Sequence, residues 1–176
     1  MSSEKHSCAL VLTGGGARAV YQVGVLRCIA RHLPNAKFDI ITGVSAGAIN
    51  AVFLASRHAP LPEVIEELSA VWRPLRVRDV MQIDASALVR NVIGWGTKLV
   101  SGGGAVAPRV HGLVDTAPLR KVLEQLFPLN SDGEIAGVAE NIARGDPKAV
   151  AVTTLDYTTG RTVTWTQGSN VEMWER

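Results

Sequence analysis

Residues 39–47 read Asp-Ile-Ile-Thr-Gly-Val-Ser-Ala-Gly. The apolar run Asp39–Thr42 predicts a short buried strand, and the alanine-rich run that follows the serine predicts a helix. Between them, the pattern Gly-x-Ser-x-Gly places a serine on a sharp strand-to-helix turn, where a glycine on either side lets strand and helix approach closely. We therefore predict a nucleophile elbow, in which Ser45 is the catalytic nucleophile and Gly43 and Gly47 are the elbow glycines.

A second glycine-rich turn, Gly14-Gly15-Gly16, lies upstream of the elbow. It follows an apolar run that predicts a strand over Cys8–Thr13, and it precedes a helix predicted over Val20–His32. Three glycines allow backbone N–H groups to point into one small space, and the helix adds the positive end of its dipole. This arrangement suits a negatively charged oxygen, so we predict that the turn forms an oxyanion hole.

Two other interpretations of this turn stay open. The spacing Gly14-x-Gly16-x-x-Ala19 also satisfies the dinucleotide-binding fingerprint at the first strand-to-helix turn of a Rossmann fold. That fingerprint needs an acidic residue at the end of the second strand, whereas Asp39 precedes the predicted strand and the strand leads into Ser45. The position of Asp39 therefore disfavours dinucleotide binding, and the serine elbow disfavours a purely structural turn.

The two glycine motifs together resemble the beginning of the patatin-like phospholipases. The resemblance rests on Gly14-Gly15-Gly16-x-Arg18 followed by the Gly-x-Ser-x-Gly elbow, and it continues through Asp115–Arg120, Ala149–Asp156 and Thr159–Arg161. Members of this family are serine lipid acyl hydrolases with a three-layer α/β/α fold, and they use a Ser-Asp dyad without a catalytic histidine. The resemblance implies a carboxylic ester hydrolase that acts on a phospholipid or another acyl lipid and needs no cofactor and no metal.

The resemblance also implies roles for individual residues, by their positions in the two motifs. Ser45 is the expected nucleophile, and Gly15 and Gly16 are expected to donate backbone N–H groups to the oxyanion. Arg18 is expected to support that loop. The oxyanion hole is therefore assigned to Gly15, Gly16 and Arg18.

One departure from the family pattern concerns the dyad aspartate, which the family carries in an Asp-Gly-Gly or Asp-Gly-Ala motif after a late strand. This sequence contains no such motif. Asp132-Gly133 predicts a turn or a helix N-cap, and Asp156 lies where two predicted strands meet in a hairpin. We therefore expect a fold that is incomplete at its C-terminus, with the aspartate further along a longer protein. A second chain that supplies the aspartate and a loss of catalytic competence are the alternatives.

An ordinary α/β-hydrolase, with a triad in the order Ser, Asp or Glu, His, is the nearest alternative serine enzyme. The chain has room for only two strands before Ser45, which is too early for that fold. His58 and His111 are the only histidines after the serine, and neither lies at the end of a predicted strand. We interpret both as surface or helix-end histidines, which disfavours a triad.

At 176 residues with 47% hydrophobic content, the chain is long enough for a single α/β domain over residues 1–176. Predicted strands alternate with predicted helices, which indicates a mainly parallel sheet with helices on both faces, in a three-layer α/β/α fold. The last two strands are expected at Ala149–Leu155 and Arg161–Thr166. The helices after the first are expected at Ala46–His58, Pro62–Trp72, Ser86–Val100, Pro118–Phe127 and Glu134–Arg144.

Charge and cysteine content limit the partners and the compartment. The formal net charge is only +2 and no long basic stripe is present, which argues against nucleic acid as a partner. The two cysteines, Cys8 and Cys28, fall in a predicted strand and a predicted helix, where we expect buried thiols. Because no signal peptide and no apolar run long enough to span a bilayer are visible, we expect a cytoplasmic protein.

Basic residues gather between Arg73 and Arg109, beside Trp72, Trp95 and several glycines. Such a segment suits the surface of an anionic membrane and the role of a mobile lid over an acyl site. The same residues fit a core-packing helix with a solvated basic face that ends in a loop, and this interpretation is slightly favoured over membrane contact.

Together these observations predict a serine-dependent acyl hydrolase of lipid degradation, cytoplasmic and in peripheral contact with the membrane. The protein is expected as a homo-oligomer or with a second chain that completes the fold. The alternative from another class is a non-catalytic module that binds an acyl lipid or a partner and lacks the dyad aspartate. An Asp-Gly-Gly motif further along the gene or in a partner chain would favour the enzyme.

Overall fold

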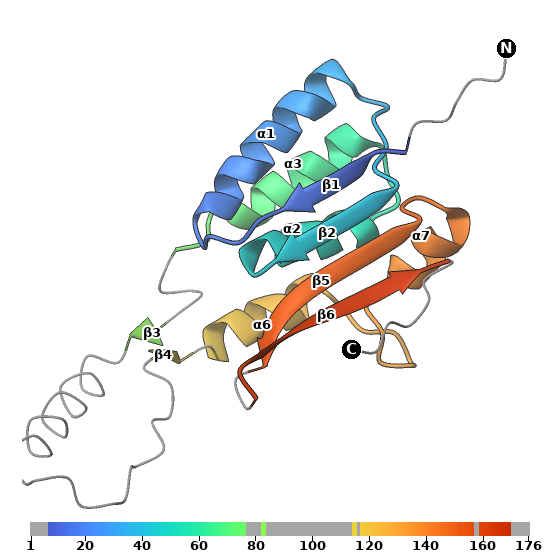
Figure 1. Ribbon diagram of the computed structural model, residues 1–176. Coiled ribbons are helices and arrows are strands. Elements are labelled where there is room, and N and C mark those ends of the chain that lie inside the picture. Colours follow the sequence, from blue (N-terminus) through green and yellow to red (C-terminus); the bar gives the residue numbers. More distant parts are fainter. Residues whose placement is uncertain (1–6, 77–81, 84–113, 116, 157–158, 170–176) are drawn as a thin grey trace, which may run out of the picture. The chain divides into compact units, whose positions relative to one another are not determined.

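The computed structural model describes residues 7–76, 82–83, 114–115, 117–156 and 159–169 (Figure 1). The chain forms two compact units, a larger one of residues 1–74 and 127–176 and a smaller one of residues 75–126. The single domain expected over residues 1–176 stays a prediction. The helix expected at Ser86–Val100, His111 and most of the basic segment lie outside the described residues.

The larger unit is built on a four-stranded mixed sheet in the order β1-β2-β5-β6 (Figure 1). Its strands are β1 (Ala9–Leu12), β2 (Ile40–Val44), β5 (Ala149–Asp156) and β6 (Arg161–Gly168). β1, β2 and β5 run parallel, and β6 pairs antiparallel with β5 in the hairpin expected from the sequence. The α/β fold with a mainly parallel sheet is confirmed, and Ser45 directly follows a central strand.

In the described part of the larger unit, the helices are α1 (Arg18–His32), α2 (Ala46–Ser56), α3 (Leu61–Trp72) and α7 (Val138–Arg144). α2 packs on β1, β2 and β5, whereas α1 and α3 pack on each other and on α2. The first three helices begin and end within about two residues of their predicted bounds, which is the usual accuracy of such boundaries.

The helix predicted at Glu134–Arg144 begins later than expected, at Val138. The side chain of Asn130 accepts hydrogen bonds from the backbone N–H groups of Asp132 and Glu134, at 3.0 and 2.9 Å. These bonds fold the segment into the turn that the Asp-Gly pair predicts, so its residues are not available to the helix.

The described residues of the smaller unit form one antiparallel strand pair and one helix. β3 (Gln82–Ile83) pairs with β4 (Val114–Asp115), and α6 spans Ala117–Leu126. Arg120 and Glu124 lie one turn apart on α6, and Nε of the arginine is 2.8 Å from Oε1 of the glutamate. Such a pair gives modest support to an exposed helix.

α2 lies at the centre of the hydrophobic core of the larger unit. Ala51, Phe53 and Ala55 are each at most 1% exposed. Because two of these residues are small, the helix can approach the sheet closely and still pack without voids. Leu26 from α1 and Leu68 from α3 complete this core on the side away from the sheet.

Both cysteines are exposed free thiols, so the prediction of buried thiols is wrong. Cys8 precedes β1 and lies at the end of the sheet. Cys28 lies on α1, but this helix buries Val23, Leu26 and Ala30, and residue 28 falls on the opposite side of the helix.

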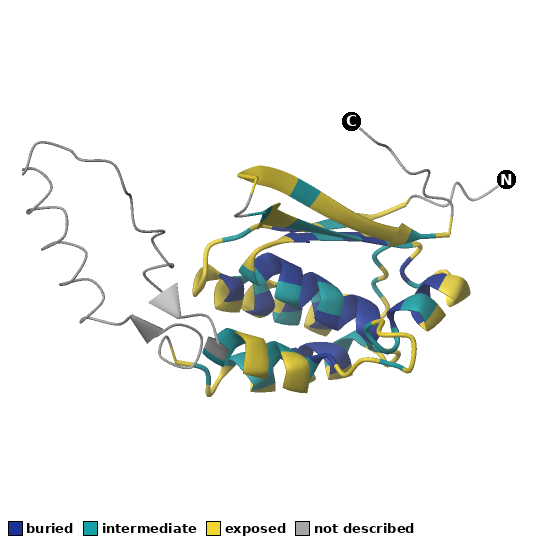
Figure 2. Ribbon diagram, turned by 90° about the horizontal axis from the view of Figure 1, so that it is seen from below, coloured by how far each residue is buried: buried dark blue, intermediate teal, exposed yellow. Residues whose placement is uncertain are grey.

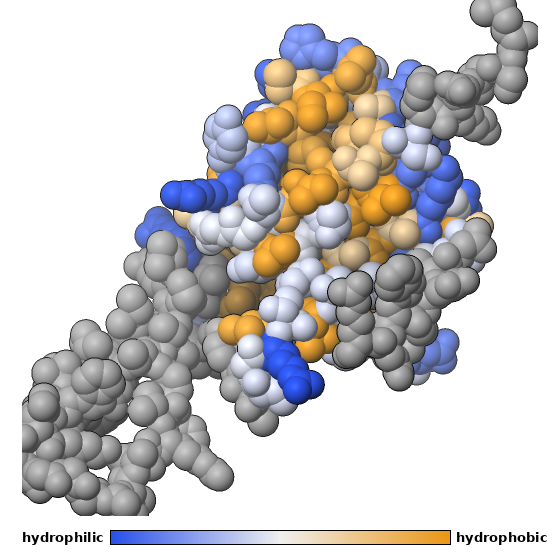
Figure 3. All heavy atoms as spheres, in the orientation of Figure 1, coloured by the Kyte–Doolittle hydropathy of each residue, from blue (hydrophilic) through white to orange (hydrophobic). Residues whose placement is uncertain are grey.

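The described helices of the larger unit lie on one side of its sheet (Figure 2). On the other side, Val11, Ile40 and Leu155 share one face, because side chains alternate along each strand and the pairing keeps equivalent residues in register. Their exposed fractions are 66%, 44% and 53%, and apolar residues cover much of this face (Figure 3). The second helical layer of the three-layer prediction is not among the described residues of this unit.

Candidate active site

Ser45 occupies a strained turn between the end of β2 and the start of α2. Its backbone angles are φ 53° and ψ −126°, and it is the one non-glycine residue with a positive φ in the described part of the chain. This region of backbone space is unfavourable for residues with a Cβ atom and costs about 1–3 kcal/mol. The side chain is exposed, which leaves its hydroxyl accessible at the carboxyl edge of the sheet. These are the features of a nucleophile elbow.

Gly43 and Gly47 allow the backbones around the serine to approach each other. A Cβ atom on Gly43 would lie 2.5 Å from the carbonyl oxygen of Gly47. A Cβ atom on Gly47 would lie 2.3 Å from the carbonyl oxygen of Leu12 and 2.5 Å from that of Thr13, at the end of β1. Neither position can hold a side chain without moving backbone, so glycine is required at both.

The glycine loop between β1 and α1 lies directly against the elbow. Gly15 has φ 140° and Gly16 has φ 57°, which turn the chain sharply from the strand into the helix. A Cβ atom on Gly14 would lie 3.3 Å from Cβ of Ser45. The two motifs, 29 residues apart between their first glycines in sequence, therefore meet at one edge of the sheet.

Backbone N–H groups of the loop are available to a ligand. The carbonyl oxygens of Gly15 and Gly16 accept hydrogen bonds from Arg18 and Ala19, at 3.2 and 3.0 Å. Within the described residues, the N–H groups of the same two glycines donate no hydrogen bond. The N-termini of α1 and α2 also converge here, and their positive dipole ends favour an anionic oxygen.

Arg18 is the first residue of α1 and packs over the loop with the aliphatic part of its side chain. A Cβ atom on Gly15 would lie 3.1 Å from Cδ of Arg18 and 3.3 Å from its Cβ. The arginine therefore covers the glycine at close range, while its side chain stays exposed.

A catalytic base is not paired with the serine in the described part of the chain, where no carboxylate or histidine is hydrogen-bonded to Ser45. Asp156 ends β5, a neighbour of β2, and its carboxylate accepts a hydrogen bond of 2.7 Å from the hydroxyl of Thr159 inside the hairpin turn. Asp132 lies in the turn before α7. The start of α7 packs near Ser56, at the end of α2 that is far from Ser45. Both aspartates thus have the turn roles that the sequence predicts.

Two polar residues near the site did not stand out in the sequence. Gln22 on α1 donates a hydrogen bond to the carbonyl oxygen of Thr13, immediately before the glycine loop. Asn50 on α2 is 0% exposed and hydrogen-bonds to Gln22. Asn50 is the one amide side chain in the mostly apolar helix α2. This pattern is a signal for a buried hydrogen-bond network, because a buried polar side chain needs partners.

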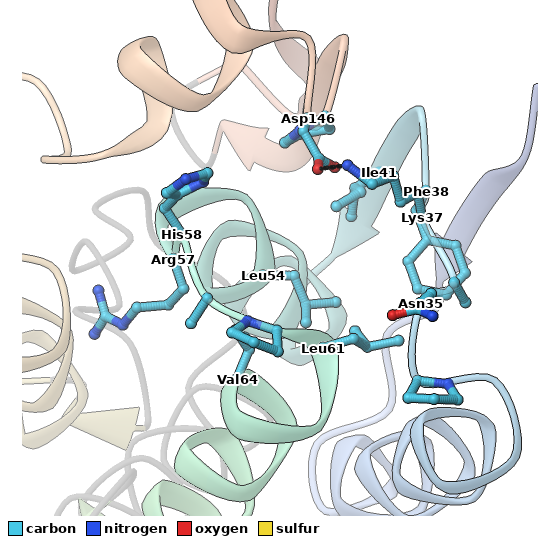
Figure 4. A pocket seen from close by; sticks show the side chains of 15 residues that line it. Asn35, Lys37, Phe38, Ile41, Leu54, Arg57, His58, Leu61, Val64 and Asp146 are labelled. Atoms are coloured by element: carbon cyan, nitrogen blue, oxygen red, sulfur yellow. Dashed lines mark hydrogen bonds and ion pairs between the residues drawn. The ribbon is translucent and has the colours of Figure 1, made fainter.

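A cavity of about 440 Å³ lies at the opposite end of the sheet from Ser45, near the amino ends of β2 and β5 (Figure 4). Lys37 and Asp146 form an ion pair beside it, and the hydrogen bond that Lys37 donates to this carboxylate raises the pKa of Lys37 above its ordinary value. The guanidinium of Arg57 points away from the cavity and lies 3.5 Å from the carboxylate of Glu67. The cavity therefore belongs to a different region from the serine and glycine motifs.

Comparison with known proteins identifies the family. The family model described as patatin-like phospholipase matches residues 10–175. The chain therefore belongs to the patatin-like phospholipase family, a family of lipid hydrolases.

Two solved structures are similar to the chain at low sequence identity. VipD from Legionella pneumophila is 16% identical with a TM-score of 0.46, and the match covers 94% of this chain and 40% of that chain. The type III effector protein ExoU is 18% identical with a TM-score of 0.45, and the match covers 93% of this chain and 36% of that chain. This chain thus spans less than half the length of either structure. A search of curated proteins found no match to the sequence.

The helices were also compared with the requirements for crossing a bilayer. No helix in the described ranges combines sufficient length with sufficient apolar character to span a membrane.

Proposed function

We propose that this chain carries the nucleophile and the oxyanion hole of a serine hydrolase that cleaves ester bonds of phospholipids or other acyl lipids. The observation that carries the proposal is the contact between the two motifs: the glycine loop lies against Ser45, and the N–H groups of Gly15 and Gly16 have no partner among the described residues. Membership of the patatin-like family supports an acyl lipid as the substrate.

In the proposed reaction, Oγ of Ser45 forms a bond to the ester carbonyl carbon while its proton passes to a base. The electron pair of the carbonyl double bond moves onto the oxygen, and the N–H groups of Gly15 and Gly16 stabilise the resulting oxyanion. Collapse of this intermediate breaks the ester bond, and the leaving alcohol takes up the proton. Water then hydrolyses the acyl-enzyme by the same steps, which regenerates the serine.

Arg18 is proposed to hold the oxyanion loop in shape, since its side chain packs over Gly15. The base is proposed to be an aspartate supplied from outside residues 1–176, either further along a longer protein or from a second chain. Such a base is needed because a serine hydroxyl is a weak nucleophile until a neighbouring group accepts its proton. The proposed setting is the cytoplasm, with peripheral contact at a membrane surface.

A fluorophosphonate probe, which reacts covalently with activated serines, tests the proposal. The chain, a Ser45→Ala variant and a Ser131→Ala control are treated with the probe, and mass spectrometry locates the adduct. In a sample that contains the base, whether it comes from a second chain or from a longer protein, we expect labelling at Ser45 that disappears in Ser45→Ala and persists in Ser131→Ala, because Ser131 lies in the exposed turn before α7.

The same experiment separates the enzyme from a binding module. If the folded chain is not labelled, the assay is repeated with any longer protein that the gene encodes. Labelling of the longer protein alone would assign the base to the additional sequence. Absence of labelling in both would contradict the proposed function and favour a non-catalytic acyl-lipid-binding module.

A further inference from the structure

A chain of hydrogen bonds connects three helices to the end of β1. Nε1 of Trp72 on α3 donates to Oδ1 of Asn50 on α2, at 2.7 Å. Nδ2 of Asn50 donates to Oε1 of Gln22 on α1, at 3.3 Å. Nε2 of Gln22 then donates to the carbonyl oxygen of Thr13, at 2.7 Å. This series of hydrogen bonds ends at Thr13, the last residue before the glycine loop.

The direction of this series of hydrogen bonds is fixed by its first donor, the indole N–H of Trp72. An indole N–H can only donate, so the oxygen of the Asn50 amide must face Trp72. The amide nitrogen of Asn50 then faces the carbonyl oxygen of Ala19, at 3.2 Å, and the oxygen of the Gln22 amide. This in turn directs the Gln22 nitrogen toward Thr13. One orientation of each amide therefore satisfies the hydrogen-bonding groups of Trp72, Asn50 and Gln22 together.

The carbonyl group that Gln22 holds lies where the two motifs meet. Thr13 directly precedes Gly14, and its carbonyl oxygen lies 2.5 Å from the position that a Cβ atom on Gly47 would occupy. A shift of this peptide group would move the glycine loop relative to the elbow. Stabilisation of an oxyanion depends on donors that are held within a few tenths of an ångström of the correct position.

We propose that Gln22 and Asn50 are positioning residues, which hold the oxyanion loop in register with the nucleophile elbow. This inference rests on the proposed function for its catalytic consequence. Its structural part, the placement of the loop, can be tested separately. Asn50 is 0% exposed, so loss of its partner would leave a buried polar group unsatisfied and favour movement of the loop.

The substitution Gln22→Glu tests the inference with little change of shape. An ionised carboxylate still accepts the hydrogen bond from Asn50 but cannot donate to Thr13. When protonated, the same group regains a donor. We therefore expect the rate of fluorophosphonate labelling at Ser45 to fall about tenfold relative to the unsubstituted protein at pH 8, since loss of about 1.4 kcal/mol corresponds to a factor of ten. The labelling rate of Gln22→Glu, divided by that of the unsubstituted protein, should rise again as the pH falls toward 5, because the introduced carboxylate becomes protonated.

Gln167→Glu is the matched control, because Gln167 is exposed and pairs with Val150 near the amino end of β5, away from Ser45. Its labelling rate should equal that of the unsubstituted protein at every pH. A labelling rate for Gln22→Glu that is unchanged, or reduced by the same factor at all pH values, would overturn the inference.

Amide hydrogen exchange provides a readout that does not depend on activity. The N–H groups of Arg18 and Ala19 donate to the carbonyl oxygens of Gly15 and Gly16, so their exchange reports on the shape of the loop. Gln22→Glu should accelerate exchange at these two amides, measured by NMR, and Gln167→Glu should not. If Ser45 is labelled neither in this chain nor in a longer protein, the proposed function fails, and the exchange rates alone decide the positioning inference. Unchanged exchange would then overturn it.

Discussion

Gly14 lies against the side chain of Ser45: a Cβ atom on Gly14 would be 3.3 Å from Cβ of the serine and 3.4 Å from the carbonyl oxygen of Val44. This contact joins the glycine loop that follows β1 to the elbow that follows β2. The two turns are neighbours because β1 and β2 are adjacent parallel strands, whose carboxyl ends lie at the same edge of the sheet. This edge of the sheet therefore depends on the absence of side chains at Gly14, Gly43 and Gly47.

Gly14→Ala should reduce reactivity more than it reduces stability. The added methyl group would press on the serine at a distance shorter than ordinary van der Waals contact, so Ser45 must shift by a few tenths of an ångström. We expect the labelling rate at Ser45 to fall several-fold while the melting temperature changes by less than about 3 °C. The two quantities are measured on the same sample. Equal labelling rates would show that the elbow tolerates this displacement.

Gly47→Ala and Gly24→Ala should change the free energy of unfolding in opposite directions. A methyl group on Gly47 would collide with the backbone of Leu12, and we expect a loss of about 3 kcal/mol. Gly24 lies within α1, and a Cβ atom there would meet nothing within 4 Å. Alanine is the better helix former, so we expect a gain of about 0.5–1 kcal/mol at this position. Urea unfolding measures both, and a stable Gly47→Ala variant would contradict the close approach of elbow and strand.

Ser45→Gly should be more stable than Ser45→Ala, although both variants lack the nucleophile. Alanine keeps the Cβ atom that makes φ 53° unfavourable, whereas glycine adopts this conformation without strain. Glycine also makes the unfolded chain more flexible, which offsets part of this gain. We therefore expect the free energy of unfolding of Ser45→Gly to exceed that of Ser45→Ala by about 1 kcal/mol. Comparison of urea midpoints gives this value. Equal midpoints would mean that the turn carries no strain.

Asp39 should make stability depend on pH at the amino end of the sheet. The Lys148 ammonium, whose Nζ lies 2.7 Å from Oδ1, and the N–H of Cys8, which donates to Oδ2 at 3.0 Å, hold the pKa of Asp39 below its ordinary value. A carboxylate with a lowered pKa stabilises the fold above its unfolded-state pKa of about 3.9, and the contribution is lost as the pH falls through the folded-state value.

The variant Asp39→Asn should therefore be less stable than the unsubstituted protein at pH 7, and the difference in urea midpoint should shrink below about pH 4. Lys148→Met serves as the second arm of a double-mutant cycle, in which the effect of Asp39→Asn should become smaller. A difference that stays constant from pH 7 to pH 3 would show that the charge of Asp39 is not responsible.

Much of this fold could be predicted because its local signals agree with one another. The strand at Asp39–Thr42 and the helix after Ser45 were separated by a glycine pattern that fits only a tight turn, and the structure places β2 and α2 on either side of it. The hairpin around Asp156 was equally clear, since two β-rich runs flank Thr159 and Gly160. In these segments the residue pattern and the tertiary contacts favour the same conformation.

Other features depend on contacts that a sequence pattern does not reveal. α7 begins later than predicted because the Asn130 side chain accepts hydrogen bonds from backbone N–H groups that a helix would otherwise use. No sequence pattern distinguishes Gln22, because its importance comes from the position of Thr13, which α1 reaches only in the folded protein. The exposure of Cys28 cannot be predicted from the residue pattern, because a small thiol suits either side of a helix.

The pairing of β2 with β5 has a consequence for the order in which the chain folds. These neighbouring strands are separated by about a hundred residues, and the smaller unit lies between them in the sequence. Contacts between such distant segments form slowly, because a long loop must close before they contribute. During synthesis, the edge of β2 that pairs with β5 therefore stays without its partner until β5 has emerged, although β1 is already present on the other side.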